Sequence, residues 1–264
     1  MTYFTFLLIF VCGPGLVLLA VAIWDQRSGR LTPGFDHSKV PLMIAVHVLL
    51  ALVYTTPWDN YLVASGVWSY NPRLVTGLTL GYVPIEEYTF FVLETLLCGL
   101  WWWFLARRIS APKPEVFQRA SGLVYRSALL LSVVWLFFTF QLFFGAEQWN
   151  YLGLICFWAL PALLPQLLFG ADLLWHYRKL VFWSIFVPGL YLSLTDLVAL
   201  QATTWQISTS QTLGIRFFGI LPLEEVVFFF ITNTLISFGL TLMLASLGWE
   251  RFAAWKARGL KGLP

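Results

Sequence analysis

Charged residues are scarce in this sequence. Of its 264 residues, 16 are Lys or Arg and 13 are Asp or Glu, so charged residues make up 11% of the chain, against about 25% in an ordinary soluble domain. Hydrophobic residues account for 59%, and a soluble globule of this size cannot cover so much apolar surface with so few charges. The composition therefore excludes a soluble domain, a disordered chain and a nucleic-acid binder, and it favours a helical membrane protein.

Cysteine and lysine are also sparse, and their positions exclude further classes of protein. The three cysteines, Cys12, Cys98 and Cys156, lie far apart in apolar stretches, and no C-x-x-C pair occurs. This argues against a disulfide framework and a zinc site, so we expect no metal. None of the five lysines falls within an apolar stretch, whereas a retinal protein needs one there to form its Schiff base.

Seven apolar stretches approach or exceed the roughly 20 residues that a membrane-spanning helix needs. The predicted spans are roughly residues 3–24, 40–57, 81–105, 123–144, 149–169, 180–200 and 218–246. Of the 16 basic residues, 14 lie in the loops and tail on one side, including Arg258 and Lys261, whereas only Arg73 and Arg216 lie on the other. By the positive-inside rule, this predicts a multi-pass cell-membrane protein with its N-terminus outside and its C-terminus in the cytoplasm.

The chain contains an internal repeat. DNYLVASGVW at 59–68 matches DLVALQATTW at 196–205, and PIEEYTFF at 84–91 matches PLEEVVFF at 222–229. We therefore expect an all-α membrane protein of seven transmembrane helices: a first three-helix repeat (1–122), a linking helix (123–148), and a second three-helix repeat with a cytoplasmic tail (149–264). Since three spans plus one linking span is an even number, both copies enter the membrane in the same direction. We predict parallel repeats related by a pseudo-two-fold axis along the membrane normal, with the site at their interface.

Six acidic residues occupy matching positions in the two repeats. On the predicted topology they gather at the outer end of the bundle: Asp59, Glu86 and Glu87 from the first repeat, and Asp196, Glu224 and Glu225 from the second. The simplest interpretation is that the Glu pairs, which follow Pro84 and Pro222 in the first turn of a helix, only stabilise helix N-termini. Their duplication favours a functional site instead, because crowding carboxyls without cations favours protonated acids.

Aromatic and polar side chains neighbour these acids. Phe90, Phe91, Phe228 and Phe229 lie one turn after the Glu pairs, where their ring faces could stabilise a cation or simply pack helices. Glu94 lies on the same helix face as Glu87, two turns later, and the second repeat has Thr232 and Asn233 there. These polar groups either extend the site inward or hydrogen-bond neighbouring helices.

Seven spans with two D-x8-W blocks and two P-x-E-E-x-x-F-F blocks resemble the integral-membrane lycopene cyclase family, in its form with both halves fused. The resemblance covers nearly the whole chain. It implies a lycopene β-cyclase, an isomerase of carotenoid biosynthesis that converts the ψ ends of lycopene to β-ionone rings by acid-catalysed, redox-neutral cyclisation. The expected catalytic residues are the six matching acids: Asp59, Glu86, Glu87, Asp196, Glu224 and Glu225. The expected substrate contacts are Phe90, Phe91, Phe228, Phe229, Trp68, Trp205, Glu94 and Asn233. Which Glu of each pair donates the proton stays open, and we favour one composite pocket.

The same resemblance leads us to expect no cofactor, and no G-x-G-x-x-G motif of a dinucleotide site is present. The expected partners are lycopene or a related ψ-end carotenoid, the lipid bilayer and other enzymes of the carotenoid pathway, and no nucleic acid. Two other functions stay open at this point. Parallel repeats with acids at their interface also describe a proton-coupled transporter, and the chain could bind carotenoid without catalysis.

Overall fold

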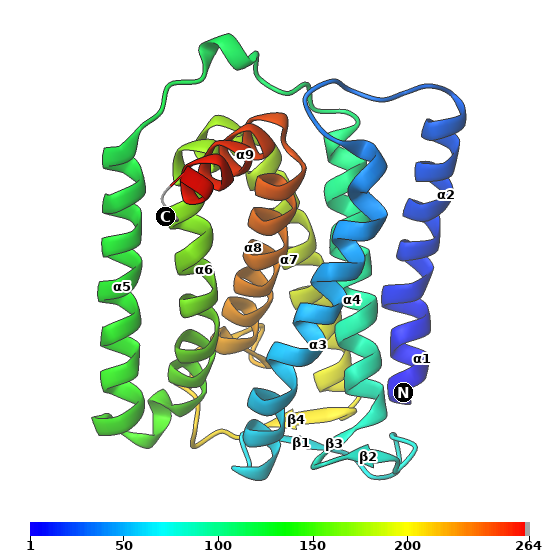
Figure 1. Ribbon diagram of the computed structural model, residues 1–264. Coiled ribbons are helices and arrows are strands. Elements are labelled where there is room, and N and C mark those ends of the chain that lie inside the picture. The colour runs from blue at the N-terminus through cyan, green and yellow to red at the C-terminus, as the bar shows by residue number, and fades with distance from the viewer. Residues whose placement is uncertain (262–264) are drawn as a thin grey trace.

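Seven long apolar helices form the body of the molecule (Figure 1). A computed structural model describes residues 1–261, with the side chains of residues 1–257, so the side chains of Arg258 and Lys261 lie outside the described part. The first span combines α1 (Tyr3–Phe6), a π-helical turn (Leu7–Cys12) and α2 (Gly13–Arg27). The others are α3 (Val40–Ala64), α4 (Ile85–Ala106), α5 (Ser121–Phe144), α6 (Asn150–His176), α7 (Arg178–Gln201) and α8 (Leu223–Leu244). Short 3-10 turns occupy His37–Lys39, Pro114–Val116 and Glu147–Trp149. The prediction of an all-α membrane fold with seven spans is confirmed.

Helix boundaries differ from the predicted spans at the prolines. Helix α3 continues past Pro57 to Ala64, because a membrane helix tolerates the hydrogen bond that an internal proline removes. Asp59 therefore lies within α3 rather than at its end. Pro84 and Pro222 were expected in the first helical turn, but both are extended N-cap residues (ψ 150° and 147°) that precede α4 and α8.

Three two-stranded antiparallel sheets lie at the end of the bundle where the N-terminus lies (Figure 1). Two are hairpins that lead into the glutamate-bearing helices: β2 (Thr79–Leu80) with β3 (Val83–Pro84), and β5 (Arg216–Phe217) with β6 (Leu221–Pro222). The third pairs β1 (Trp68–Tyr70) with β4 (Trp205–Ile207), so that Ser69 faces Gln206. This pairing brings the tryptophans of the two D-x8-W blocks into one ribbon.

The two helices that begin with the Glu pairs lie at the centre of the bundle. Helix α4 packs against α2, α3, α7 and α8, and α8 packs against α3, α4, α6 and α7. In the most hydrophobic stretch of α4, 61% of the residues are buried, against 6% in α5, which packs mainly on α6. The acids that open α4 and α8 therefore enter the protein interior, whereas α5 exposes most of its apolar surface.

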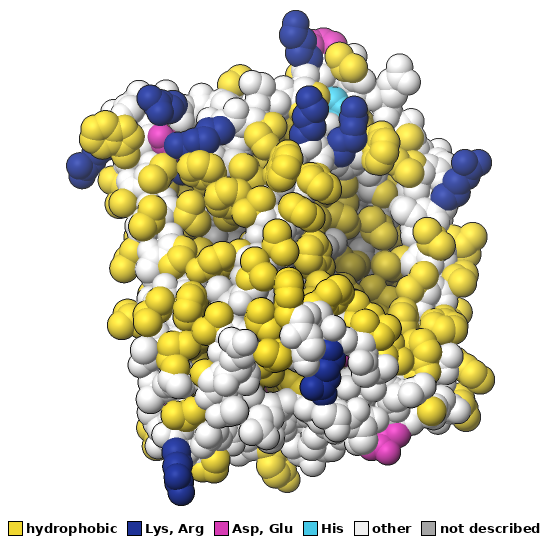
Figure 2. Space-filling view, turned by 180° about the vertical axis from the view of Figure 1, so that it is seen from behind, with side chains coloured by type: hydrophobic (Ala, Val, Ile, Leu, Met, Phe, Trp, Pro, Cys, Tyr) yellow, Lys and Arg dark blue, Asp and Glu magenta, His cyan; other side chains and the backbone are white. Residues whose placement is uncertain are grey.

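An apolar surface separates two polar ends of the molecule. On the face drawn in Figure 2, hydrophobic side chains form a band across the middle, and most of the visible Lys and Arg side chains lie at the upper end. The C-terminal helix α9 (Ser246–Lys261) crosses this same end (Figure 1). There Arg107 and Arg108 both pair with Asp25, at 3.1 and 2.8 Å. The band and the two polar ends suit a multi-pass protein in a bilayer.

Candidate active site

The first glutamate of each pair turns toward a loop. Glu86 accepts a hydrogen bond from the backbone N–H of Thr76 at 2.6 Å, and Glu224 accepts one from the N–H of Leu213 at 2.7 Å. Both glutamates are fully buried, and each donor lies in the loop that precedes the helix carrying that glutamate. These two carboxyls therefore fix the loops that lead into α4 and α8.

The second glutamate of each pair accepts hydrogen bonds from tyrosines, of which Tyr3 and Tyr151 are buried and Tyr70 is half-buried. Glu87 accepts hydrogen bonds from the hydroxyls of Tyr3 at 2.6 Å and Tyr70 at 3.0 Å. Glu225 accepts one from the hydroxyl of Tyr151 at 2.5 Å. Sequence analysis missed these tyrosines, because Tyr3 and Tyr151 are 84 and 74 residues from their partners. The one available signal was that both begin the first span of a predicted repeat.

The two aspartates are buried beside these glutamates but differ in their partners. Asp196 accepts a hydrogen bond from the indole N–H of Trp205 at 2.8 Å. In the first repeat, neither carboxyl oxygen of Asp59 has a hydrogen-bond partner among the described residues, and the indole nitrogen of Trp68 has none there either. The D-x8-W block thus forms its internal hydrogen bond in the second repeat and not in the first.

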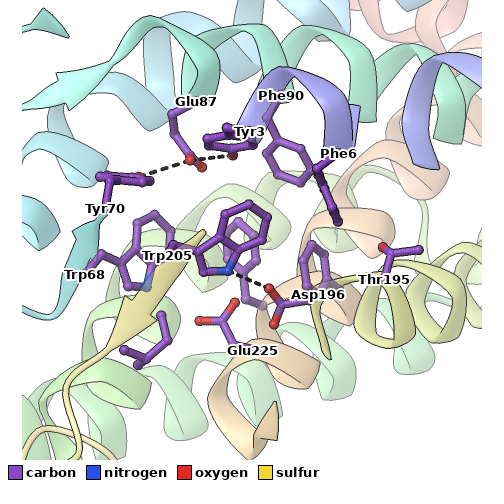
Figure 3. Close-up of a pocket in the computed structure, with 13 residues that line it drawn as sticks. Tyr3, Phe6, Trp68, Tyr70, Glu87, Phe90, Thr195, Asp196, Trp205 and Glu225 are labelled. Carbon is purple, nitrogen blue, oxygen red and sulfur yellow. Dashed lines mark hydrogen bonds between the residues drawn. The ribbon is translucent and has the colours of Figure 1, made fainter. Parts of the chain in front are cut away.

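The second glutamates, together with Asp196, face a small cavity (Figure 3). Glu87 reaches it from α4, Glu225 from α8 and Asp196 from α7, while the β1–β4 ribbon contributes two tryptophans. Its volume is about 30 Å³, room for no more than one or two water molecules. The cavity is lined by Tyr3, Phe6, Trp68, Tyr70, Glu87, Phe90, Thr195, Asp196, Trp205, Ile207, Glu225, Phe228 and Phe229.

Three of the expected substrate contacts lie elsewhere. Phe91 and Glu94 border a second, larger cavity on the inner side of Phe228. Glu94 accepts a hydrogen bond there from Thr232 at 3.2 Å, which links α4 to α8. Asn233 donates to the carbonyl of Phe229 in its own helix at 2.7 Å and lines neither cavity.

Among the described residues, no Lys or Arg side chain forms an ion pair with a carboxyl of the acidic cavity. The ion pairs among the described residues join Lys39 to Asp36, Arg107 and Arg108 to Asp25, and Arg251 to Asp172, and none includes a carboxyl of the cavity. Tyr70 lies in the connecting ribbon, outside the spans. Burial, and secondly the charge of Glu87, raise the pKa of Tyr70 well above its ordinary value, so this hydroxyl stays protonated and donates to Glu87.

The fold and the site together define a multi-pass α-helical membrane protein with a buried cavity of acids and aromatic rings. The chain belongs to the lycopene cyclase family: the sequence model described as Lycopene cyclase matches residues 1–105 and 148–246. The resemblance read from the motifs is thereby confirmed. The two matched stretches cover most of the two predicted repeats, and the interval between them contains the whole of α5.

Curated relatives match most of the chain. Lycopene beta-cyclases from two strains of Halobacterium salinarum are 38% identical over 251 residues, which is 91% of this chain and 95% of theirs. The bifunctional lycopene cyclase/phytoene synthase of Aspergillus oryzae is 36% identical over 75% of this chain, and that of Gibberella fujikuroi is 36% identical over 86%. The chain spans 33% and 37% of the length of these fungal relatives. No solved structure is significantly similar to the chain.

Proposed function

We propose that this protein is a lycopene β-cyclase, which closes the linear ψ ends of lycopene into β-ionone rings during carotenoid biosynthesis. One observation carries the proposal: Glu87, Asp196 and Glu225 meet aromatic rings in a buried cavity that has no ion pair among the described residues. The relatives from Halobacterium salinarum, which are lycopene beta-cyclases matched over 95% of their length, support it.

The reaction begins with transfer of a proton to carbon. A carboxyl buried without a cation avoids the cost of a buried charge by holding a proton, and a cavity with room for no more than one or two water molecules limits the loss of that proton to solvent. We assign the donor to Glu225, which accepts a single tyrosine hydrogen bond. Its proton adds to C2 of the end group, the electrons of the C1=C2 double bond form the new C–H bond, and a cation remains at C1.

Ring closure and loss of a proton complete the isomerisation. The electrons of the C5=C6 double bond form the C1–C6 bond, so the cation moves to C5. A carboxylate then removes the proton from C6, and the electrons of that C–H bond restore C5=C6. We assign this base to Glu87, because two tyrosine hydroxyls donate to it and such bonds stabilise a carboxylate. One proton is gained and one is lost, so no electrons are exchanged with a cofactor.

Aromatic rings around the acids suit the cationic intermediate. Phe90, Phe228 and Phe229 line the cavity with Trp68 and Trp205. A ring face near a cation contributes about 0.5–2 kcal/mol. We assign these five residues to stabilisation of the cation, and the first glutamates, Glu86 and Glu224, to positioning of the loops.

The two halves form one composite pocket in this proposal, as parallel repeats would. Glu87 bonds Tyr3 and Glu225 bonds Tyr151 in the same manner, which is what a two-fold relation between the halves requires. The β1–β4 register supports it as well. Trp68 faces Ile207 and Tyr70 faces Trp205. The third residue of each strand therefore lies opposite the tryptophan of the other strand, as a two-fold axis through the ribbon requires.

The decisive experiment is expression of the chain in a lycopene-accumulating host. We expect γ-carotene and β-carotene in the pigment extract. Unchanged lycopene, with the protein folded in the membrane, would refute the proposed activity. Retention of carotenoid without any product would point to a non-catalytic binding protein.

We also propose that the protein lies in the cell membrane with its N-terminus outside. Thr79, in the β2–β3 hairpin, and Lys113, in the loop before α5, are exposed at opposite ends of the bundle. In a cysteine-free background, a membrane-impermeant maleimide added to intact cells should label Thr79→Cys and not Lys113→Cys. The reverse pattern would contradict the orientation.

A further inference from the structure

The acidic cavity is too small for the substrate that the proposed function assigns to it. About 30 Å³ accommodates one or two waters, far less than the branched end group of a carotenoid. A second cavity of about 330 Å³ lies next to it. Phe228 belongs to the lining of both cavities, so its ring borders the larger space on one side and the acidic cavity on the other.

The larger cavity lies within the bundle and opens toward the bilayer. It is bordered by α3, α4, α6 and α8, and Figure 1 shows α8 in the space between α6 and α3. Its mouth includes Leu50 and Tyr54 of α3, which are 57% and 44% exposed at the apolar surface. Leu50, Tyr54 and Trp158 also line an outer groove of about 960 Å³ beside α5. The groove, the inner cavity and the acids therefore form a series that leads inward from the lipid.

Flat aromatic rings line this route. Trp58 stacks on Trp158 with ring centroids 4.5 Å apart and planes 18° apart, and on Phe228 at 5.8 Å and 9°. The Tyr54 hydroxyl donates to the backbone carbonyl of Trp158 at 2.8 Å and so bridges α3 and α6 at the mouth. Nearly parallel rings offer the extended planar contact that a conjugated hydrocarbon chain makes and a flexible lipid tail does not.

We propose that the conjugated chain of a linear carotenoid reaches the acids from the bilayer through this channel between α3 and α6, and that the ring of Phe228 swings aside to admit the end group. The identity of the occupant rests on the proposed function. A pure hydrocarbon of this length dissolves in lipid and not in water, so its access must come from the side of the bundle. On the water-facing side, the β1–β4 ribbon contributes Trp68, Tyr70, Trp205 and Ile207 to the cavity wall.

Two small residues on facing walls allow a direct test. Ala51 of α3 and Ala162 of α6 both line the inner cavity and are half-buried, so tryptophan at either position would fill it. Ala45 of α3 is exposed and lines none of the cavities described above, which makes Ala45→Trp the matched control. Each variant would be purified in detergent from lycopene-accumulating cells, and total carotenoid, cyclised or not, would be measured per protein.

We expect Ala51→Trp and Ala162→Trp to lower the bound carotenoid by at least about tenfold, equivalent to about 1.4 kcal/mol of binding, and Ala45→Trp to leave it unchanged. Monodisperse elution and the near-UV circular dichroism spectrum would establish folding, and leucine would replace tryptophan in a variant that does not fold. Filled variants that retain as much carotenoid as the control, or a wild type that retains none, would overturn the channel. Because this assay counts carotenoid whatever its ring state, absence of cyclised product would refute the proposed activity separately.

Discussion

Replacing the four paired glutamates by glutamine, one at a time, separates the proposed acid and base from the loop anchors. Glutamine has nearly the same shape as glutamate but cannot supply or accept the transferred proton. A positioned general acid or base contributes about 10²–10⁴-fold to a rate. We therefore expect Glu87→Gln and Glu225→Gln each to lower the rate of cyclisation by at least about 100-fold, with the protein still folded.

Glu86 and Glu224, the first glutamates of the two pairs, should respond differently, because their hydrogen-bond partners are backbone N–H groups. In Glu86→Gln and Glu224→Gln the amide oxygen can still accept the loop N–H that the carboxylate accepts now. A hydrogen bond to a charged group contributes about 1.5–3 kcal/mol and a neutral one about 0.5–1.5 kcal/mol. The expected loss is therefore about 1 kcal/mol of stability, with the rate within a few-fold of wild type.

The assay is the initial rate of γ-carotene and β-carotene formation by membranes supplied with lycopene in liposomes, normalised to folded protein. Thermal inactivation of each variant measures the stability difference. The reasoning is refuted if Glu86→Gln or Glu224→Gln loses as much activity as its neighbour at equal protein level. It is also refuted if Glu87→Gln and Glu225→Gln both retain the wild-type rate.

Three further predictions follow from named contacts. Tyr151→Phe removes the hydroxyl that donates to Glu225. This bond strengthens from about 0.5–1.5 to about 1.5–3 kcal/mol as Glu225 gives up its proton and becomes charged, so we expect initial cyclisation rates about 10-fold lower. An unchanged rate would contradict the assigned role. Because burial raises the pKa of Tyr70, its hydroxyl should remain un-ionised at pH 10, where an ordinary tyrosine is about half ionised. The absorbance at 295 nm of the wild type minus that of Tyr70→Phe should then show no tyrosinate. A difference equal to half of one tyrosinate would disprove the raised pKa. Asp25→Ala leaves the buried Arg107 without its ion pair. It should therefore lower the free energy of unfolding, measured in detergent, by about 3–5 kcal/mol. An unchanged free energy of unfolding would show that the ion pair is dispensable.

The spans were predictable because hydropathy is a property of consecutive residues. Seven apolar stretches predicted the seven long helices, and the errors fell where a local rule met a tertiary environment. Pro57 suggested the end of a span, yet α3 continues to Ala64, because packing within the bundle outweighs the one hydrogen bond that a proline removes. The family, too, followed from the order and spacing of two short blocks.

The sequence did not indicate which glutamate of each pair faces the cavity and which one binds the loop. Adjacent residues in a helix point about 100° apart, so only one member of a pair can face a given cavity. Glu86 and Glu87 have the same chemistry and both lie at the start of an apolar helix. The direction of each depends on how α4 is rotated against its neighbours, and that rotation is set by packing with residues far away in the sequence.

The sequence by itself determined that this is a seven-span membrane protein with duplicated acids, because composition, hydropathy and repeat spacing are carried by the chain without reference to its fold. Only the tertiary structure decided which carboxyls face the cavity, that Tyr3, Tyr70 and Tyr151 are their partners, and that an aromatic channel adjoins them. The physical reason is that these hydrogen bonds and cavities form between elements that are far apart in the sequence. The bonded side chains are up to 84 residues apart, and they meet only after the helices have packed.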